Sequence, residues 1–172
     1  ALGMFENPYR DPQQAAKVVA EQKHWNDAYN VHVQSVVPLK NRKGLLPLSA
    51  ADVRERKAYV ESFRSEQEKV DQETSSLRRL VQEKYGFTLT EDYHEADLAI
   101  LFVSPTSGAY FHATKGYLEL DICEDKEVSD VDEEGRPTVD THMETTLCGT
   151  GKLKEIAQEL HSRGGRVIIN VK

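Results

Sequence analysis

Glu144 is the residue of this sequence whose type and position best suit acid–base chemistry. It lies near the end of a long polar segment, just before Thr145 and Thr146 and a helix expected to begin near Gly149. A carboxylate held beside a cleft can act as a general acid. A glutamate that precedes a helix can instead stabilise the start of that helix. Spacing alone favours this structural role over the catalytic one.

A second group of polar and aromatic residues is suited to a small polar ligand. Tyr110, His112 and Lys115 lie close together in a stretch that also contains Gly108 and Gly116. Aromatic rings stack on the apolar faces of sugars, and polar side chains fix sugar hydroxyls. An ordinary surface loop without a ligand explains the same residues equally well.

Metal and nucleophile chemistry find little support in the sequence. His142 and Glu144 form a His-x-Glu pair, but no HExxH motif and no third ligand at a standard spacing accompany them. His142 is instead a candidate for substrate binding. The acidic stretch 124–134 lacks the spacing of a calcium loop and is expected to be a solvated hairpin or a mobile excursion. No G-x-S-x-G, reactive-cysteine, G-x-G-x-x-G or P-loop motif is present, so we expect no metal and no cofactor.

Composition describes a globular chain that is poorly suited to nucleic acid. The chain has 172 residues, of which 38% are hydrophobic and 30% charged, and its net charge is −7. A negative surface repels phosphates, and no apolar run approaches the roughly 20 residues of a membrane span. Two cysteines and no visible secretory signal favour a reduced, cytoplasmic setting. The first residue is not Met, which an excised fragment or a processed product would explain.

The first part of the chain is predicted to be helical and then extended. Asp11-Pro12 has the form of an N-cap followed by proline at the first helical position, and the helix continues to about Ala20. A second helix carries the spacing of Trp25 to Val33. Residues 35–40 favour a short strand or an extended segment, which Pro38 would confine to a sheet edge. An apolar loop is expected at 44–48.

The rest of the chain alternates strands with helices, which is typical of an α/β protein. Strands are predicted at 57–63, 87–89, 98–103 and 166–171, and the last two are expected to be buried. One helix is predicted at 67–85 and should stop at Gly86. A second helix is predicted around 153–160 and should end at Gly164-Gly165. This order predicts a three-layer sandwich with a mostly parallel sheet and helices on both faces. The segment 104–148 contains no confident helix or core strand, and it follows the carboxyl end of a buried strand. Open α/β sheets place their ligand sites there.

Several separated stretches resemble motifs of family 3 glycoside hydrolases. Residues 2–9 (LGMFENPY) resemble GLFENPY, 35–41 resemble SIVLLKN, 45–48 resemble VLPL, and 96–103 resemble the strand ADVAIVVVG. Residues 166–171 resemble the strand that follows the next helix of that family. The order and spacing agree across most of the chain.

This resemblance implies that residues 1–12 are an interdomain linker and that residues 13–172 form the C-terminal α/β sandwich domain of such an enzyme. The catalytic (β/α)8-type barrel would be absent from this chain and would be its partner within the same polypeptide. The substrates would be oligo- or aryl-β-glycosides with a terminal β-D-glucosyl or β-D-xylosyl residue. No nucleic acid and no membrane partner is implied.

The resemblance also implies a retaining mechanism with two carboxylates about 5 Å apart. The nucleophilic aspartate of the family lies on the barrel, so the chain alone is expected to be inactive. The acid/base glutamate commonly comes from the loop after the ADVAIVVVG strand, where Glu144 is the first candidate and Glu119 the second. The alternative is a carbohydrate- or protein-binding α/β module without catalysis. A flavodoxin-like signalling or cofactor domain is a third possibility, which the lack of a phosphate loop disfavours.

Overall fold

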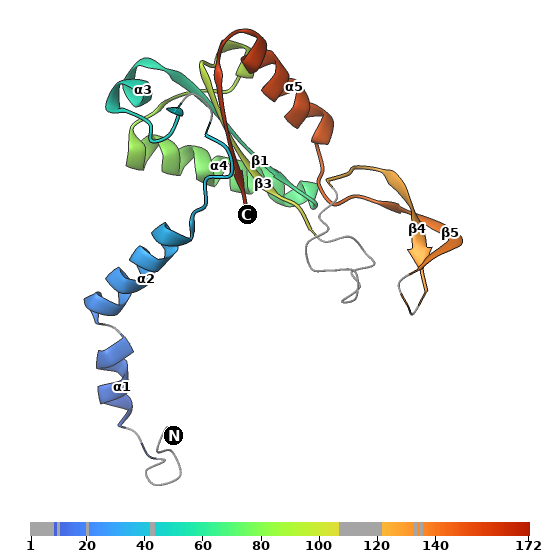
Figure 1. Cartoon of the computed structure of the whole chain (residues 1–172). Coiled ribbons are helices and arrows are strands. Elements are labelled where there is room, and N and C mark those ends of the chain that lie inside the picture. Colours follow the sequence, from blue (N-terminus) through green and yellow to red (C-terminus); the bar gives the residue numbers. More distant parts are fainter. Residues whose placement is uncertain are drawn as a thin grey trace. The chain divides into compact units, whose positions relative to one another are not determined.

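A computed structural model describes residues 9, 11–19, 21–41, 44–106, 122–132, 134 and 136–172. The chain divides into two compact units, Ala1–Leu46 and Pro47–Lys172, which we describe separately (Figure 1). The linker expected at residues 1–12 stays a prediction.

The first unit contains the two predicted helices, α1 (Pro12–Val19) and α2 (Gln22–Ser35). The Asp11 carboxylate accepts a hydrogen bond of 2.9 Å from the backbone N–H of Gln13, so Asp11 caps α1 as predicted. Neither helix has a buried residue. Trp25 and Tyr29 of α2 therefore lie on an exposed surface.

The segment after α2 forms no strand, so of the two alternatives predicted for 35–40 the structure shows the extended segment. Ser35 ends the helix, and Val36 has an extended backbone with φ −74° and ψ 113°. A strand needs a hydrogen-bonded neighbour, and none of the described residues pairs with this segment. The loop predicted at 44–48 is confirmed. The side-chain amide of Asn41 supports its start, donating to Leu46 O (2.8 Å) and accepting from Leu46 N (3.0 Å).

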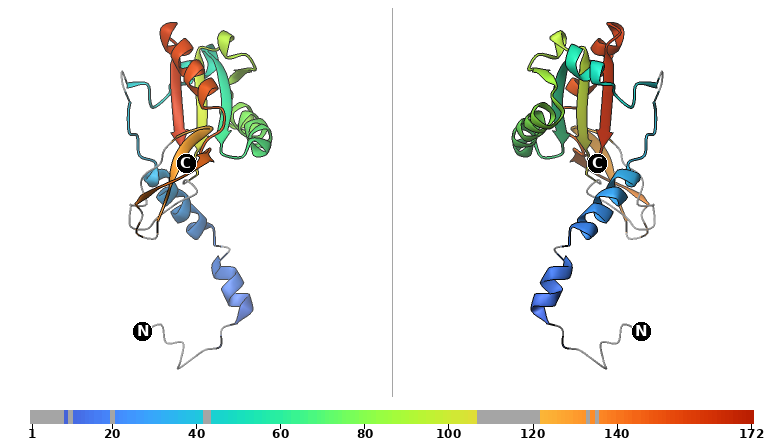
Figure 2. Two further views of the ribbon diagram at one scale, coloured as in Figure 1. Left: turned by 90° about the vertical axis from the view of Figure 1, so that its right-hand side faces the viewer. Right: turned by 90° about the vertical axis from the view of Figure 1, so that its left-hand side faces the viewer.

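The second unit is built on a four-stranded parallel sheet with the order β2-β1-β3-β6. Its strands are β1 (Lys57–Arg64), β2 (Thr88–Thr90), β3 (Leu98–Ser104) and β6 (Arg166–Val171). Figure 2 shows β6, β3 and β1 side by side. The long helices α4 (Gln67–Tyr85) and α5 (Thr150–Ser162) lie on opposite faces of the sheet (Figure 1). The predicted α/β architecture is confirmed.

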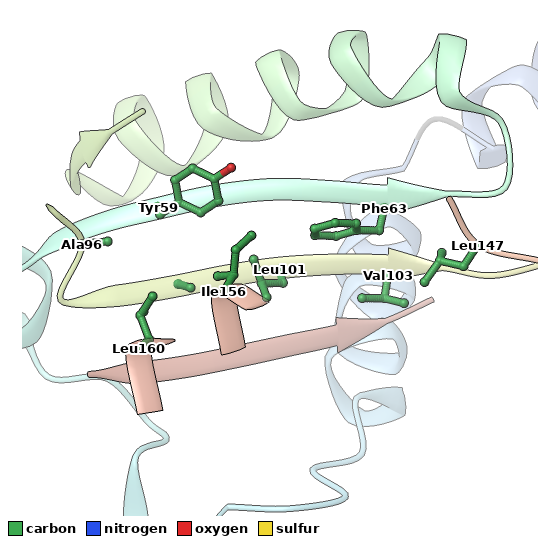
Figure 3. Packing of buried hydrophobic residues seen from close by; sticks show 9 residues of the cluster. Tyr59, Phe63, Ala96, Leu101, Val103, Leu147, Ile156 and Leu160 are labelled. Carbon is green, nitrogen blue, oxygen red and sulfur yellow. The ribbon is translucent and has the colours of Figure 1, made fainter. Parts of the chain in front are cut away.

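Two separate hydrophobic cores, one on each face, join the sheet to its helices and so form a three-layer arrangement. On one face, Leu101 and Val103 of β3 pack with Ile156 and Leu160 of α5, and Phe63 joins them from β1 (Figure 3). The other core joins side chains of β1 and β3 to α4 and to the short helix α3 (Ala50–Glu55), through Ala58, Val60, Leu98, Ile100, Val81 and Val53. Alternate residues of β1 and β3 thus serve opposite cores, as the apolar run of β3 predicted for that strand.

Strand β6 is less buried than predicted. Val167 and Ile168 are half-buried, and Ile169 and Val171 are 50% and 56% exposed. Among the described strands, β6 is at the edge of the sheet and pairs with β3 alone. Its apolar run therefore covers only part of each core.

Two short elements, a helix and a 3₁₀ turn, escaped prediction. Helix α3 begins at a capping box, in which Ser49 and Asp52 exchange side-chain and backbone hydrogen bonds. A 3₁₀ turn covers Tyr93–Glu95. Strands β4 (Lys126–Val131) and β5 (Pro137–Glu144) form a separate antiparallel hairpin. A hairpin was one of the two alternatives for the acidic stretch, and this alternative is confirmed.

Polar side chains of α4 complete the outer edge of β1. Strand β2 is so short that it pairs only with residues 57–59. Farther along β1, Arg78 Nε donates to Val60 O (3.0 Å), and the buried N–H of Ser62 donates to Thr74 Oγ1 (3.0 Å). The Ser62 hydroxyl donates to Glu73 Oε2 (2.7 Å). The helix thereby replaces the strand partners that β1 lacks on this side.

Thr74→Val should destabilise the chain, because the methyl that replaces the hydroxyl cannot accept the hydrogen bond from the buried Ser62 N–H. We expect a loss of about 1 to 3 kcal/mol in the free energy of unfolding, measured by urea denaturation. Thr74→Ser should keep most of the stability. Ser75→Ala is the control, because the Ser75 hydroxyl is exposed and bonds only within α4, to Asp71 O. Equal stability of Thr74→Val and the wild type would contradict this role of α4.

Candidate functional site

The β4–β5 hairpin is fixed to the carboxyl edge of the parallel sheet. We call residues 122–125 and 144–149, which lead into and out of it, the hairpin base. Thr106, just after β3, donates its backbone N–H to Thr146 O (3.0 Å). Cys148 donates its N–H to Arg64 O at the end of β1 (2.8 Å). The hairpin therefore starts where β1 and β3 end, the position predicted for a ligand site (Figure 1).

Internal hydrogen bonds make the hairpin base a fixed unit. The buried hydroxyl of Thr146 accepts from Cys123 N (3.0 Å). Cys123 O accepts from the backbone N–H groups of Thr146 (3.0 Å) and Leu147 (3.1 Å). The Leu147 side chain is fully buried in the core beneath α5 (Figure 3). Because polar and apolar contacts both hold this segment, the position of Glu144 is fixed relative to the sheet.

Glu124 links the hairpin base to the start of α5. Its carboxylate accepts hydrogen bonds from Gly149 N (2.8 Å), Thr150 N (3.0 Å) and Thr150 Oγ1 (3.1 Å). Backbone N–H groups at a helix start have no partner within the helix, and they favour a negative charge. The hydrogen bond from Gly149 is the main cause that lowers the pKa of Glu124. The helix-start role considered for Glu144 thus belongs to Glu124.

One face of the hairpin brings three titratable side chains into a row, which we call the Asp130–His142–Glu144 row. In the antiparallel register, Val128 faces His142 and Lys126 faces Glu144. His142 Nδ1 lies 2.5 Å from Asp130 Oδ1, and His142 Nε2 lies 3.6 Å from Glu144 Oε2. The side chains of Asp130, His142 and Glu144 are 28%, 23% and 15% exposed. The imidazole therefore lies between two partly buried carboxylates.

This geometry assigns a proton to one nitrogen of the imidazole. An ionised carboxylate can only accept, so the short contact requires that His142 Nδ1 donate to Asp130. Nε2 then faces Glu144 either as a second donor or as an acceptor. A separation of 3.6 Å is longer than a hydrogen bond, but such contacts often tighten only when a substrate is bound. The arrangement can hold a proton next to Glu144.

The structure brings together two of the residues selected from the sequence, His142 and Glu144. The two residues alternate along β5 and so point to the same face of the hairpin. The other candidates, Tyr110, His112, Lys115 and Glu119, lie outside the described residues. Sequence reasoning missed Asp130 and Glu124. Both are acidic residues in a stretch rich in acidic residues, and only the strand register and the tertiary contact with α5 distinguish them.

Within the described part of the chain, no group of three or more His, Cys, Asp or Glu side chains has the arrangement of a metal site. A search of the same residues finds no helix with the length and apolar character needed to cross a bilayer. Comparison of the chain with protein-family models, curated proteins and solved structures gave no match. The site is therefore interpreted from its own geometry.

The anchor at Glu124 leads to a pH dependence that can be measured. The pKa of this carboxyl lies below its ordinary value of 4.5, so its stabilising contact is complete above that value. The contact is lost as the pH falls through the lower folded-state pKa. We expect the amide proton resonances of Gly149 and Thr150 to stay constant from about pH 7 to pH 5 and to move at lower pH, when Glu124 takes up its proton.

Two variants check the assignment of this titration to Glu124. In Glu124→Gln the movement of both amide resonances should disappear, because the amide does not titrate. Glu127→Gln removes an exposed carboxylate of β4 that bonds to Thr141 and should leave the movement unchanged. Resonances that move equally in wild type and Glu124→Gln would show that another group titrates against the start of α5.

Proposed function

We propose that this chain is the C-terminal α/β sandwich domain of a family 3 glycoside hydrolase, a retaining β-glycosidase that acts on terminal β-D-glucosyl or β-D-xylosyl residues. In this proposal the chain supplies part of the active-site cleft, and Glu144 is the acid/base. The observation that carries the proposal is the placement of Glu144 beside His142, on a hairpin fixed to the carboxyl edge of the sheet.

The fold gives the proposal further support. The stretch that resembles the ADVAIVVVG motif coincides with β3 and the two residues before it. The stretch at 166–171 coincides with β6, after the intervening helix α5. Each resemblance in this part of the chain therefore falls on an element of the type that the family pattern implies. Glu144 also belongs to the segment between these two motifs, where the resemblance places the acid/base residue.

The proposed reaction divides its work between two domains. In the first step a carboxylate of the barrel attacks the anomeric carbon, while Glu144 gives its proton to the leaving oxygen. In the second step Glu144 takes a proton from water, and the water oxygen replaces the carboxylate at the anomeric carbon. The chain supplies one of the two carboxylates. We therefore expect it to be inactive by itself.

The same proposal includes the partners and the cellular setting. The barrel domain of the same polypeptide and an oligo- or aryl-β-glycoside would face the hairpin, without nucleic acid or membrane. A cytoplasmic setting is part of the proposal. Both Cys123 and Cys148 are free thiols in the structure, which supports a reducing compartment.

A binding module without catalysis remains the alternative, and one observation favours it. The hairpin exposes two apolar side chains of β5, Val139 (97%) and Met143 (61%). Exposed apolar groups on a projecting hairpin suit contact with another protein. A module of this kind would need neither a barrel nor a proton donor, so kinetics separate the two functions.

The proposal is tested with the complete reading frame that encodes this chain and with the 172-residue chain itself. With 4-nitrophenyl β-D-glucoside and β-D-xyloside, the chain alone should give no turnover above buffer. The complete product should hydrolyse at least one of the two. Glu144→Gln should lower its kcat by about 100- to 10,000-fold, the usual contribution of a general acid, and azide should restore part of the rate.

Glu127→Gln is the matched control for Glu144→Gln, because it removes an exposed carboxylate from the same hairpin. Its kcat should equal that of the wild type. An unchanged rate in Glu144→Gln would remove Glu144 from the acid/base role. Turnover by the chain alone would contradict the division of the two carboxylates between domains, and an inactive complete product would favour the binding module.

A further inference from the structure

We infer that Asp130 and His142 are positioning residues for Glu144, and that His142 acts on this carboxylate rather than on the sugar. The inference rests on the proposed function, because it assigns a task to Glu144. It starts from the order of the side chains along the hairpin face. Asp130 holds one ring nitrogen of His142, and the other ring nitrogen faces Glu144.

The hairpin backbone determines where Asp130 points. Asp130 lies two residues after Val128, the register partner of His142, so regular alternation places both side chains on the same face. The ladder shifts register between Ser129 and Val131, where the additional residues lie on β5. Here the Asp130 carboxylate reaches His142, which belongs to the opposite strand, at 2.5 Å. This short contact orients the imidazole, and it favours the tautomer that carries its proton on Nδ1.

Two residues that can carry a positive charge neighbour Glu144 on the hairpin. His142 comes from β5, two residues before Glu144, and Lys126 is its register partner on β4. The imidazole faces Oε2, so we assign the other oxygen, Oε1, to the leaving group. When Glu144 has given up its proton, a His142 ring that carries a proton on Nε2 can stabilise the carboxylate. Glu144 regains a proton from water in the second step, so the row gains and loses no proton over a turnover.

A purely structural role makes different predictions from a positioning role. If the contact between Asp130 and His142 only stiffened the hairpin, its loss would slow the hydrolysis of every substrate to a similar degree. If the contact orients the acid, its loss should slow the first step only where the leaving group needs a proton, and kcat/KM reports that step. Phenyl β-glycosides need that proton, whereas 2,4-dinitrophenyl β-glycosides leave without it. The ratio of the two rates therefore distinguishes the roles.

The first experiment uses the 172-residue chain and requires no enzymatic activity. Long-range ¹⁵N–¹H correlation spectra report which ring nitrogen of His142 carries a proton. We expect Nδ1 to be protonated in the wild type and in Asp130→Asn, which keeps an acceptor oxygen. In Asp130→Ala the Nδ1–H signal should weaken in favour of Nε2–H. A wild-type ring protonated only at Nε2 would overturn the inference, whether or not the complete protein is a glycosidase.

The second experiment measures the kinetics of the complete gene product. Asp130→Ala should lower kcat/KM, which reports the first chemical step, by roughly tenfold to a hundredfold for the phenyl glycoside and by less than about twofold for the dinitrophenyl glycoside. Asp130→Asn should recover part of the loss. Asp140→Asn is the matched control, because Asp140 is an exposed carboxylate on β5 of the same hairpin, and it should behave as wild type.

The two experiments distinguish failure of the positioning role of Asp130 from failure of the proposed glycosidase function. Equal losses for both leaving groups would reduce Asp130 to a structural residue and overturn the inference while the glycosidase proposal stands. If the wild-type product hydrolyses neither substrate, the proposed function fails, and the positioning role fails with it. In that case the ring spectra still decide whether the Asp130–His142 contact exists in solution.

Discussion

The return of the chain to the carboxyl edge of the sheet is the constraint on which the candidate site depends. Two backbone hydrogen bonds make this connection, Thr106 N to Thr146 O and Cys148 N to Arg64 O. They tie one short segment to the ends of β3 and β1 together, and the fully buried Leu147 lies between their two contact points. Because Glu144 precedes this segment by two residues, its position is set by the sheet and by the core beneath α5.

The same edge is stabilised from the side of α4. Glu73 accepts from the buried Ser62 hydroxyl and from Arg64, whose carbonyl is one of the two anchor points of the hairpin base. Thus the last residues of β1 contact α4 through side chains and the hairpin base through the backbone. A short β2 would otherwise leave this end of β1 without partners on its outer edge. The polar side chains of α4 therefore hold the strand end that positions the candidate site.

The sequence was most informative where one local signal determines the structure. Helical spacing, buried apolar runs and the left-handed Gly86 predicted α4, α5, β1 and β3. It was misleading at β6, because a run such as RVIINV is compatible with an edge strand as well as with a central one. The Ser49-x-x-Asp52 capping box could have revealed α3. His142 and Glu144 were visible as an alternating pair, whereas Asp130 joins them only through the pairing of β4 with β5, which no local pattern encodes.

Two carboxylates of the hairpin have different surroundings, and under the proposed function they have opposite tasks. Glu124 accepts three hydrogen bonds at the start of α5, so its ionised form is stabilised and can anchor the hairpin. Glu144 has an imidazole beside it instead of helix N–H groups, and the proposed acid role requires that it carry a proton at the start of each turnover. Acid weakens the anchor at Glu124 only when this carboxyl takes up its own proton. Because the pKa of Glu124 is lowered, first by the hydrogen bond from Gly149, the hairpin base stays anchored to α5 at a pH where an ordinary glutamate would already be protonated.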